Sequence, residues 1–461
     1  MRLTSPLRVI ADLPRLLWHP RRSREHIIAF QEQRLRQLVR HAYDNVPYYR
    51  RLFDEAGIKP ADIRGLSDIE RIPITTKATL QSVGGSEMLS REISPSKLIV
   101  RETNGSTGVP LKVRRQHMEQ IVPVLFLWRV RRELGLRRDV RVTFLTKYGQ
   151  SSSPRSLGSK ARRQLQSLVG LRTWTRVSCT APIEEVARQV VESNPDVIGG
   201  YASALNRLAR ELGDGQTKVR PRLLVSVAEQ LSPTMRTRIE KVFGAPVRDT
   251  YAAYELGMIA SECPRGGTYH ICDDNVIVEV LKDHSSALAI DPGESGELIG
   301  TSLHFAAMPI IRYQLGDIVT RGPERCACGS PFTTLTAIQG RMNDFFPLPD
   351  GRLLHPYLIG TAVWKPSLEW MHQYQVIQQR RDRVLMRIVP LRHPNAGQIA
   401  DLERVLGDVL GPLVQLSFQI VDNIPEEPNG KFRIYRSLVE SEYNQSPERT
   451  NGEGHATGRQ T

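Results

Sequence analysis

The chain has 461 residues and a formal net charge of +14, with 40% hydrophobic and 24% charged residues. This length allows two or three domains with buried cores, and the composition is that of a globular protein, which excludes collagenous and disordered classes. The sequence has no run of roughly 18 uninterrupted apolar residues, so no transmembrane segment is predicted.

The positive charge is spread along the chain. Only 11 of the 63 basic residues are Lys, and aromatic residues make up 6%. A nucleic-acid surface needs basic residues clustered on one face, preferably with stacking aromatics, so no nucleic-acid partner is predicted. The densest basic segment is 1–51, with 11 Arg against four acidic residues. It is expected to pack on its own domain, because Pro6, Pro14 and Pro20 interrupt any long amphipathic helix; the alternative is an anionic membrane surface.

The predicted location is the cytoplasm, with a peripheral position at the membrane as the alternative. The first 20 residues lack an apolar stretch followed by a small-residue cleavage site. The five cysteines are too few and too unevenly spaced for the disulfide framework of a secreted protein.

The order of predicted elements indicates an α/β core. Helices are expected in the first hundred residues, including a periodic apolar stretch at 27–39 that ends near Asn45-Val46-Pro47. From residue 98, short β-branched runs alternate with amphipathic helices, which predicts parallel strands. The expected strands are 98–100, 140–145, 196–198 and 223–227, and the expected helices are 183–192 and 204–212. After Cys263 the sequence becomes strand-rich, with 276–281 and 296–301.

We therefore predict an α/β fold with a large multi-layer N-terminal domain of β-sheets and packed helices at 1–340. A small α+β C-terminal domain is expected at 341–445, with strands at 375–379, 384–389 and 414–421 and a helix at 400–410. Residues 446–461 are polar and are expected to form a disordered tail.

A loop rich in glycine and hydroxyl groups follows the first predicted strand. Its sequence is Thr103-Asn104-Gly105-Ser106-Thr107-Gly108-Val109-Pro110. Glycine lets backbone N–H groups come close to an anion, and the hydroxyl side chains add donors, which is typical of a phosphate-binding loop. A polar hairpin turn is the alternative, and Leu111-Lys112-Val113-Arg114 predicts its return strand.

Cys263, His270, Cys326 and Cys328 offer three thiolates and an imidazole, a set that suits tetrahedral Zn²⁺. Nearby glycines predict turns that present these ligands. The alternatives are reduced, buried cysteines at two strand ends, or a zinc site in which Cys272 replaces one ligand.

Six motifs in order resemble those of the adenylate-forming superfamily of acyl-CoA synthetases, and the loop at 103–110 is the first. The others are Ser226-Val227-Ala228-Glu229, Asp249-Thr250-Tyr251-Ala252-Ala253-Tyr254-Glu255-Leu256-Gly257, the segment 308–317 ending in Asp317, Gly340-Arg341-Met342-Asn343-Asp344 and Pro428-Asn429-Gly430-Lys431. Two further segments, 41–50 and 72–77, resemble the phenylacetate-CoA ligase branch. The resemblance covers nearly the whole chain except the tail.

The resemblance implies a nucleotide site. The ATP phosphates would be held by Thr103, Gly105, Ser106, Thr107 and Gly108. Further cofactor-binding residues would be Ala228, Glu229, Tyr251, Tyr254, Asp317 and Arg341. Asp317 would accept the ribose hydroxyls, although it could instead cap a turn. The small domain would be mobile and rotate about a hinge near Arg341 and Asn343.

Three residues are expected to act in catalysis. Lys431 would stabilise the transition-state phosphate, with an ordinary exposed turn lysine as the alternative. Glu255 would be a Mg²⁺ ligand, because Mg²⁺ takes carboxylate and phosphate oxygens. Arg312 would reach either a phosphate or a structural carboxylate.

The predicted function is AMP-forming activation of a small-molecule carboxylic acid, followed by acyl transfer to coenzyme A. One alternative transfers the acyl group to an amine, as in surface-polysaccharide synthesis, and another is a catalytically silent nucleotide-binding scaffold. Tyr254, Ala252 and Asn343 depart from the residues usual in the family, which weakens any inference of the substrate. The acid pocket is expected at Tyr201, Ala202, Ser203 and Ala228, and the oligomeric state stays open, with a homodimer as one alternative.

Overall fold

The computed structural model describes residues 3–83, 85–102, 111–133, 140–146, 174–213, 218–282, 291–341, 346–354, 359, 362–363, 370–425 and 433–439. Contacts divide the chain into two compact units. Unit 1 comprises the described residues of 1–101, 112–340 and 425–433, and unit 2 those of 102–111, 341–424 and 434–461. The domain bounds expected from the sequence, 1–340, 341–445 and 446–461, stay a prediction.

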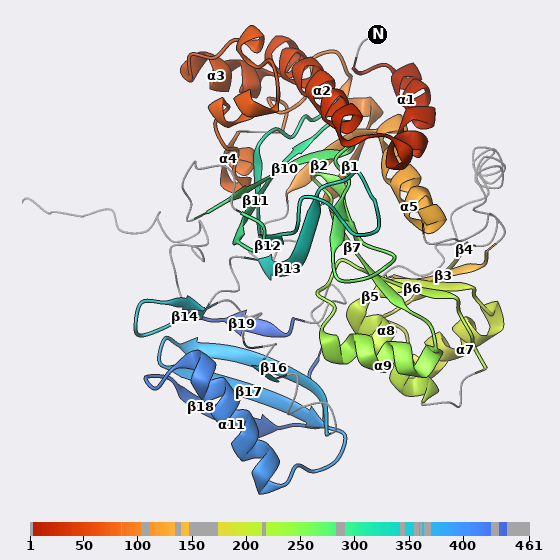
Figure 1. Cartoon of the computed structure of the whole chain (residues 1–461), viewed down its shortest axis with the longest axis vertical. Helices are drawn as coiled ribbons and strands as arrows, with labels where there is room; N and C mark the ends of the chain where they lie inside the picture. The colour runs from red at the N-terminus through yellow and green to blue at the C-terminus, as the bar shows by residue number, and fades with distance from the viewer. Residues whose placement is uncertain are drawn as a thin grey trace, which may run out of the picture. The chain divides into compact units, whose positions relative to one another are not determined.

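Helices form the N-terminal part of unit 1 (Figure 1). They are α1 (Pro6–Trp18), α2 (Arg24–Asn45), α3 (Pro47–Glu55) and α4 (Lys77–Ser82), joined by short 3₁₀ turns. The Ser23 side chain accepts a hydrogen bond from the backbone N–H of His26 and so caps the start of α2. Pro47 then opens α3 directly after α2. The predicted helix and its end near residue 45 are confirmed.

The N-terminal segment packs on its own unit. Arg8 donates a 2.8 Å hydrogen bond to the carbonyl of His304, and Arg34 forms a buried ion pair with Asp12. Leu16 is buried, whereas Trp18 is 53% exposed and lies under the guanidinium of Arg21. These contacts favour the packed alternative for the Arg-rich segment.

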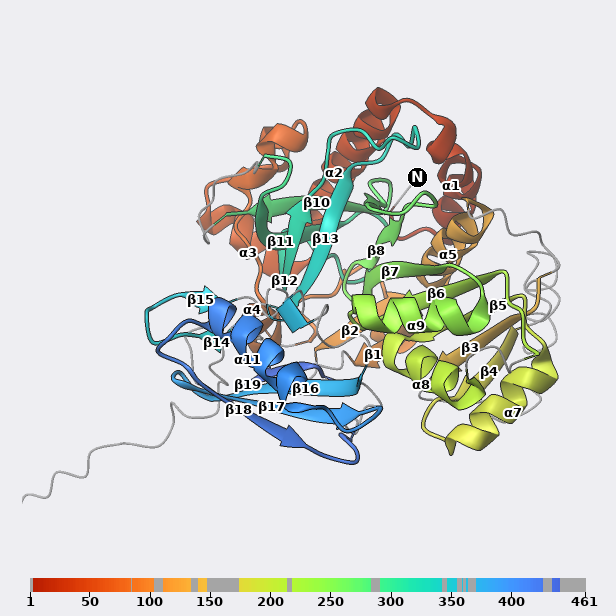
Figure 2. The same cartoon turned by 60° about the horizontal axis from the view of Figure 1, so that its bottom comes forward.

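Parallel strands form one part of the main sheet. They are β3 (Val142–Thr146), β4 (Trp174–Ser178), β5 (Val197–Tyr201), β6 (Leu223–Val227) and β7 (Val247–Ala253). The helices α7 (Ile183–Ser193), α8 (Ala202–Leu212) and α9 (Pro233–Phe243) lie together against this part of the sheet (Figure 2). α5 (Ile121–Glu133) packs against α1 and β8. The predicted alternation is confirmed for the strands at 140–145, 196–198 and 223–227, whereas the strand predicted at 98–100 lies outside this sheet.

Mainly antiparallel strands continue the same sheet. They are β8 (Gly257–Glu262), β9 (Tyr269–Ile271), β10 (Val276–Leu281), β11 (Ser295–Ser302), β12 (Tyr313–Arg321) and β13 (Thr334–Arg341). Among the described residues the sheet has eleven strands in the order β10-β11-β12-β13-β9-β8-β7-β6-β5-β3-β4. β1 (Leu98–Glu102) and β2 (Lys112–Gln116) form a separate pair, so the return strand predicted after residue 110 is present.

Unit 2 is a small α+β unit. Its elements are β14 (Phe346–Pro347), β15 (Leu353–Leu354), β16 (Met371–Arg380), β17 (Arg383–Pro390), α11 (Ala396–Leu410), β18 (Gln415–Ile420) and β19 (Tyr435–Ser437). In the described part of the unit, four strands form a mixed sheet in the order β18-β17-β16-β19. Asn395 and Gln398 form a reciprocal capping box at the start of α11. The predicted α+β character is confirmed, and the tail at 446–461 lies outside the described residues.

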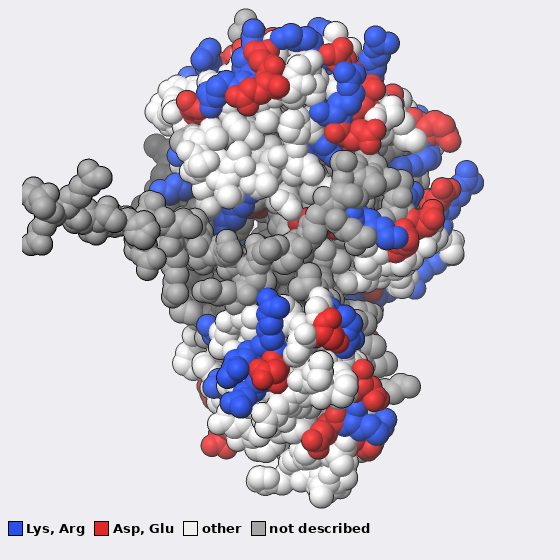
Figure 3. All heavy atoms as spheres, turned by 90° about the vertical axis from the view of Figure 1, so that its left-hand side faces the viewer, with Lys and Arg blue, Asp and Glu red and all other residues white. Residues whose placement is uncertain are grey.

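Part of the positive charge lies inside the protein. The guanidinium-bearing residues Arg8, Arg34, Arg115, Arg129 and Arg312 are all buried. On the face drawn in Figure 3, basic and acidic side chains are interspersed. Within the described chain, no helix combines the length and the hydropathy that a membrane crossing requires.

Candidate active site

Three parallel strands end at the same edge of the main sheet. In the register of β5, β6 and β7, Tyr201 lies beside Val227, and Val227 lies beside Thr250. The residues that follow each strand therefore gather at one carboxyl edge, which is where ligands bind in open α/β sheets. This edge includes the predicted pocket residues Ser203 and Ala228.

Tyr251 and Asp317 are brought together although 66 positions separate them in the sequence. The phenol of Tyr251 donates a hydrogen bond to Asp317 Oδ2, and Asp317 is only 9% exposed. Tyr251 belongs to β7 and Asp317 to β12, and in the sheet order β13, β9 and β8 lie between them. A flat sheet would hold strands four positions apart at about 19 Å. Curvature of the sheet therefore joins two of the predicted nucleotide-binding residues.

Glu255 lies in the turn between β7 and β8 and is 8% exposed. The backbone of this turn is held by Arg115, whose Nη2 donates to the carbonyl oxygens of Glu255 at 2.7 Å and Tyr254 at 3.1 Å. The Tyr254 side chain is 57% exposed. The two hydrogen bonds from Arg115 thus fix the backbone that carries the predicted Mg²⁺ ligand Glu255. The aromatic ring of Tyr254 lies beside it, largely in solvent.

The turn after β6 has a strained backbone. Ala228 has a φ of 62°, in the left-handed region that costs energy for a residue with a Cβ atom. Glu229 Oε2 accepts a 2.8 Å hydrogen bond from the backbone N–H of Ser203, in the first turn of α8. The Glu229 carboxylate therefore satisfies a free amide at a helix N-terminus, a position that favours negative charge.

Arg312 contacts a carboxylate, which is the second of its two predicted partners. Its guanidinium donates to both oxygens of Glu279, at 2.8 to 3.2 Å, and to the backbone carbonyls of Glu70 and Ile72. The residue has a φ of 45° and is 2% exposed. This arrangement favours a positioning role at the start of β12, and a catalytic role for Arg312 stays a prediction.

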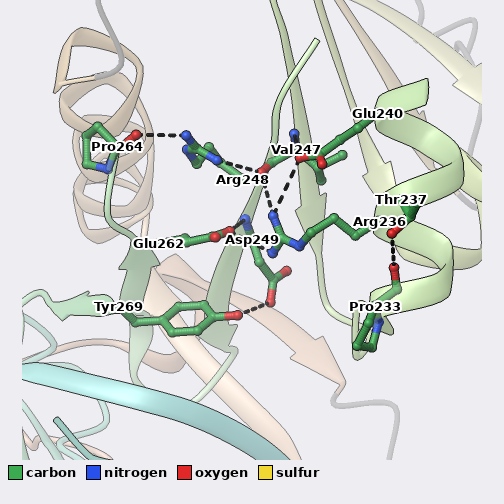
Figure 4. A network of polar contacts seen from close by, with 10 residues as sticks. All are labelled: Pro233, Arg236, Thr237, Glu240, Val247, Arg248, Asp249, Glu262, Pro264 and Tyr269. Atoms are coloured by element: carbon green, nitrogen blue, oxygen red, sulfur yellow. Dashed lines mark hydrogen bonds and ion pairs between the residues drawn. The ribbon is translucent and has the colours of Figure 1, made fainter. Parts of the chain in front are cut away.

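A polar network lies on β7, two residues before Tyr251 (Figure 4). Asp249 Oδ2 accepts a 3.0 Å hydrogen bond from the Tyr269 hydroxyl, and the Asp249 N–H donates to Glu262. Arg236 pairs with Glu262 at 2.9 Å. Burial raises the pKa of Asp249 to about 6, although hydrogen bonds oppose this shift.

Several predicted site residues lie outside the described residues. These are Thr103, Gly105, Ser106, Thr107, Gly108 and Lys431, together with the hinge residue Asn343. Arg341 is the last residue of β13, and only its backbone is described. Their roles stay predictions.

The structure brings the four predicted metal ligands together. The donor atoms of Cys263, His270, Cys326 and Cys328 all lie within 4.8 Å of one another. Cys263 Sγ is 3.7 Å from Cys326 Sγ, and Cys328 Sγ is 3.3 Å from His270 Nε2. A tetrahedral ion with Zn–S distances of about 2.3 Å places its sulfur ligands about 3.8 Å apart, so the spacing fits zinc. We call these four residues the Cys–His cluster; Cys272 is not among them.

The Cys–His cluster favours one thiolate, at Cys326, whereas burial raises the pKa of Cys328 to about 11. Burial alone would raise the pKa of Cys326, but hydrogen bonds with Thr268, Cys328 and His270 outweigh burial and lower this pKa to about 6. The backbone N–H of Arg265 lies 3.4 Å from Cys263 Sγ and adds a second donor toward sulfur. Negative sulfur atoms are the form that binds a metal ion.

The sequence did not single out Arg115 or Glu119. Both are buried, and Arg115 faces the same way on β2 as the buried Val113. A buried position in this strand was predictable from its alternation, but the partners of a charged side chain at such a position were not.

Comparison with known proteins supports the motif resemblance. The family model of the CapK C-terminal domain matches residues 348–437. A phenylacetate-coenzyme A ligase of Thermus thermophilus is 28% identical over 364 residues, which cover 77% of this chain and 79% of the ligase. Protein CapK of Staphylococcus aureus is 22% identical over 413 residues, which cover 88% of each chain. A crystal structure of 2-hydroxyisobutyryl-CoA ligase in the postadenylation state with R3-HIB-AMP has a TM-score of 0.73 at 20% identity, covering 90% of each chain.

The chain therefore has the fold of the adenylate-forming enzymes. Four curated relatives are phenylacetate-coenzyme A ligases, and the structural neighbours include 2-hydroxyisobutyryl-CoA ligase and an anthranilate CoA ligase, which is the enzyme class that the sequence predicts. The resemblance to the phenylacetate-CoA ligase branch of the superfamily is thereby confirmed.

Proposed function

We propose that the chain uses ATP to convert a carboxylic acid into an acyl-adenylate and then transfers the acyl group to coenzyme A. The observation that carries the proposal is the hydrogen bond from Tyr251 to Asp317, which joins two nucleotide motifs at one site. Tyr251 orients the Asp317 carboxylate, whose other oxygen is suited to accept a ribose hydroxyl. The five cysteines, all of them described, form no disulfide bond, which agrees with a reducing cytoplasm.

The first half-reaction needs positive charge at the α-phosphate as pyrophosphate leaves. Glu255 would hold Mg²⁺, which neutralises phosphate oxygens when bound. The buried carboxylate at the end of β7 fits this role, because Mg²⁺ is usually held by one or two carboxylates together with substrate phosphates. Lys431 would supply a further cation, and the loop at 103–108 would supply N–H donors to the phosphates.

The acid pocket would lie at the carboxyl edge formed by Tyr201, Ser203 and Ala228. Tyr254, in the turn between β7 and β8, places an exposed ring where the family usually has a small hydroxyl residue. We infer that this ring adds bulk beside the acid or the phosphates, so the acid used by the relatives is not carried over to this chain. The chemistry common to all candidates is a free carboxylate.

A second candidate function uses an amine as the acyl acceptor. The observation that favours it is the match of residues 348–437 to the CapK C-terminal domain. The resemblance assigns acceptor entry to this small domain after its rotation, so this domain would decide which acceptor is used. The nucleotide residues would be the same for both acceptors.

We further infer that the Cys–His cluster holds a structural zinc ion. All four ligands come from the protein, which is typical of a structural site, since catalytic zinc keeps a position open for water or substrate. The ion would tie the β8–β9 connection to the segment before β13.

The test is release of pyrophosphate from ATP over a panel of carboxylic acids, without acceptor, with coenzyme A and with amines. We expect at least one acid to give release, and coenzyme A to be consumed with it. Product formation with an amine but not with coenzyme A would select the second candidate. No release with any acid would reject both and favour a nucleotide-binding scaffold.

A further inference from the structure

Arg115 is a buried cation with no direct role in the proposed chemistry. It lies on β2, the strand that follows residues 103–110, and is 3% exposed. Its guanidinium stacks on the ring of Phe305, with 3.7 Å between Cζ and the ring centroid. Burial lowers the pKa of Arg115 to about 10, so the side chain remains protonated at neutral pH.

The guanidinium binds two segments that carry predicted site residues. Nη2 donates to the carbonyls of Glu255 and Tyr254, at 2.7 and 3.1 Å, and Nη1 donates to the carbonyl of Met308 at 3.4 Å. The first segment carries the predicted Mg²⁺ ligand. The second leads through 308–317 to Asp317.

Glu119 makes the complementary contacts from the same part of the chain. Its Oε1 accepts hydrogen bonds from the backbone N–H groups of Ala306 and Ala307, at 2.6 and 3.0 Å. Its Oε2 accepts from the N–H of Gln116 at 2.7 Å, which fixes Glu119 against the end of β2. Arg115 and Glu119 therefore bind carbonyls and amides of the same segment near residues 305–308.

Only arginine can make this set of contacts. Carbonyls in different directions need several donors in a rigid plane, and the plane must also stack on an aromatic ring; lysine offers a single compact ammonium group. The direct hydrogen-bond acceptors are neutral carbonyls, and the nearby carboxylates of Glu119 and Glu255 stabilise the buried charge through space.

We propose that Arg115 is a positioning residue for the predicted Mg²⁺ ligand Glu255, because its guanidinium fixes the backbone of Glu255 and Tyr254 to β2. The Glu255 carboxylate would then meet a Mg²⁺–nucleotide complex without reorganisation of its backbone at each turnover. The inference deepens the proposed function and rests on it for the role of Glu255.

The test compares ATP binding with and without Mg²⁺ by calorimetry in the full chain and in Arg115→Lys and Arg115→Met. For the wild-type chain we expect Mg²⁺ to tighten ATP binding. In both variants, the factor by which Mg²⁺ increases the affinity for ATP should be at least about tenfold smaller than in wild type, equal to about 1.4 kcal/mol. The affinity for metal-free ATP should change less than about threefold. The loss should be larger for Met than for Lys, because Lys retains a charged group that donates hydrogen bonds.

Arg129→Lys is the matched control. Arg129 is equally buried, stacks on two rings and donates to Asp274 and to the Leu16 carbonyl, away from the turn at Glu255. Arg129→Lys should lower the melting temperature without changing the Mg²⁺-dependent gain in ATP affinity.

The proposal would be overturned by Arg115 variants that have a lower melting temperature but keep the full gain. If Arg115→Met does not fold, the result for Arg115→Lys is used. The variants could show that MgATP binding depends on Arg115 while the wild-type chain releases no pyrophosphate. That result would reject the proposed function and leave the positioning role of Arg115 intact.

Discussion

The Cys–His cluster and the Tyr251–Asp317 site lie on the same group of strands but are assembled in different ways. The cluster draws its ligands from two short segments, 263–270 and 326–328, and its four donor atoms converge within 4.8 Å. The nucleotide site is predicted to draw on residues from 103 to 431, and among the described ones Tyr251 reaches Asp317 only because the sheet curves. A local site is stabilised by its own ligands, whereas a distributed site depends on the whole unit for its geometry. The two should therefore respond differently to mutation.

The largest effect is expected at the distributed site, for Lys431→Ala. Loss of a cation that stabilises transition-state charge should lower adenylation by roughly 10³-fold or more, so that it is nearly abolished. Thioester formation from a preformed acyl-adenylate should stay within a few-fold, because the resemblance assigns that step to another face of the small domain. Pyrophosphate release and thioester formation are measured separately. The control is Lys282→Ala, an exposed lysine paired with Glu294. Equal loss of both half-reactions would show that Lys431 is an ordinary structural residue.

The local site should respond in stability rather than in chemistry. Cys326→Ser removes one thiolate, so bound zinc should fall well below one ion per chain and the free energy of unfolding by on the order of 4 kcal/mol. Adenylation per folded molecule should change little. Cys179→Ser is the matched control, since Cys179 is buried and outside the Cys–His cluster. Wild-type protein purified without chelator and lacking zinc by metal analysis would remove the zinc inference.

The same difference explains what could be predicted from the sequence. The sequence identified all four residues of the Cys–His cluster, because short turns bring such residues together. The β-branched runs identified β5 and β6, and the motif around Tyr251 identified the site, but no local pattern shows that β7 and β12 approach each other across three strands. The sequence predicted that Arg312 would contact a phosphate or a carboxylate, but it did not show that the carboxylate is that of Glu279, on a different strand.

Asp317→Asn tests the contact on which the distributed site depends. An amide has one acceptor oxygen in place of two and no charge, so binding of ribose hydroxyls should weaken and KM for ATP should rise by roughly 30-fold, about 2 kcal/mol. KM for the acid should change far less. Tyr251→Phe keeps Asp317 but removes its donor, and should raise KM for ATP by a smaller factor. If Asp317 only caps a turn, Asp317→Asn will lower the melting temperature and leave KM for ATP unaltered.

Asp249 links the two regions, since it lies on β7 before Tyr251 and its partner Tyr269 precedes the cluster ligand His270 (Figure 4). Burial raises the pKa of Asp249 from 3.8 to about 6, so between these values the folded chain keeps a proton that the unfolded chain has lost. Its contribution to stability therefore falls as pH rises toward 6 and is constant above it. Asp249→Asn has no such proton.

The free energy of unfolding of Asp249→Asn, measured relative to wild type in denaturant titrations, should therefore rise between pH 4 and pH 6 by on the order of 2 kcal/mol and then level off. Tyr269→Phe is the control: it keeps the Asp249 carboxyl but removes the hydrogen bond to its charged form, so it should retain the pH dependence and extend it to higher pH. A difference between Asp249→Asn and wild type that is flat from pH 4 to pH 7 would mean that Asp249 ionises normally, and that water rather than protein surrounds it. The effect is expected on stability and not on KM for ATP. It would therefore distinguish Asp249, which stabilises β7, from Tyr251 and Asp317, which are expected to bind the nucleotide.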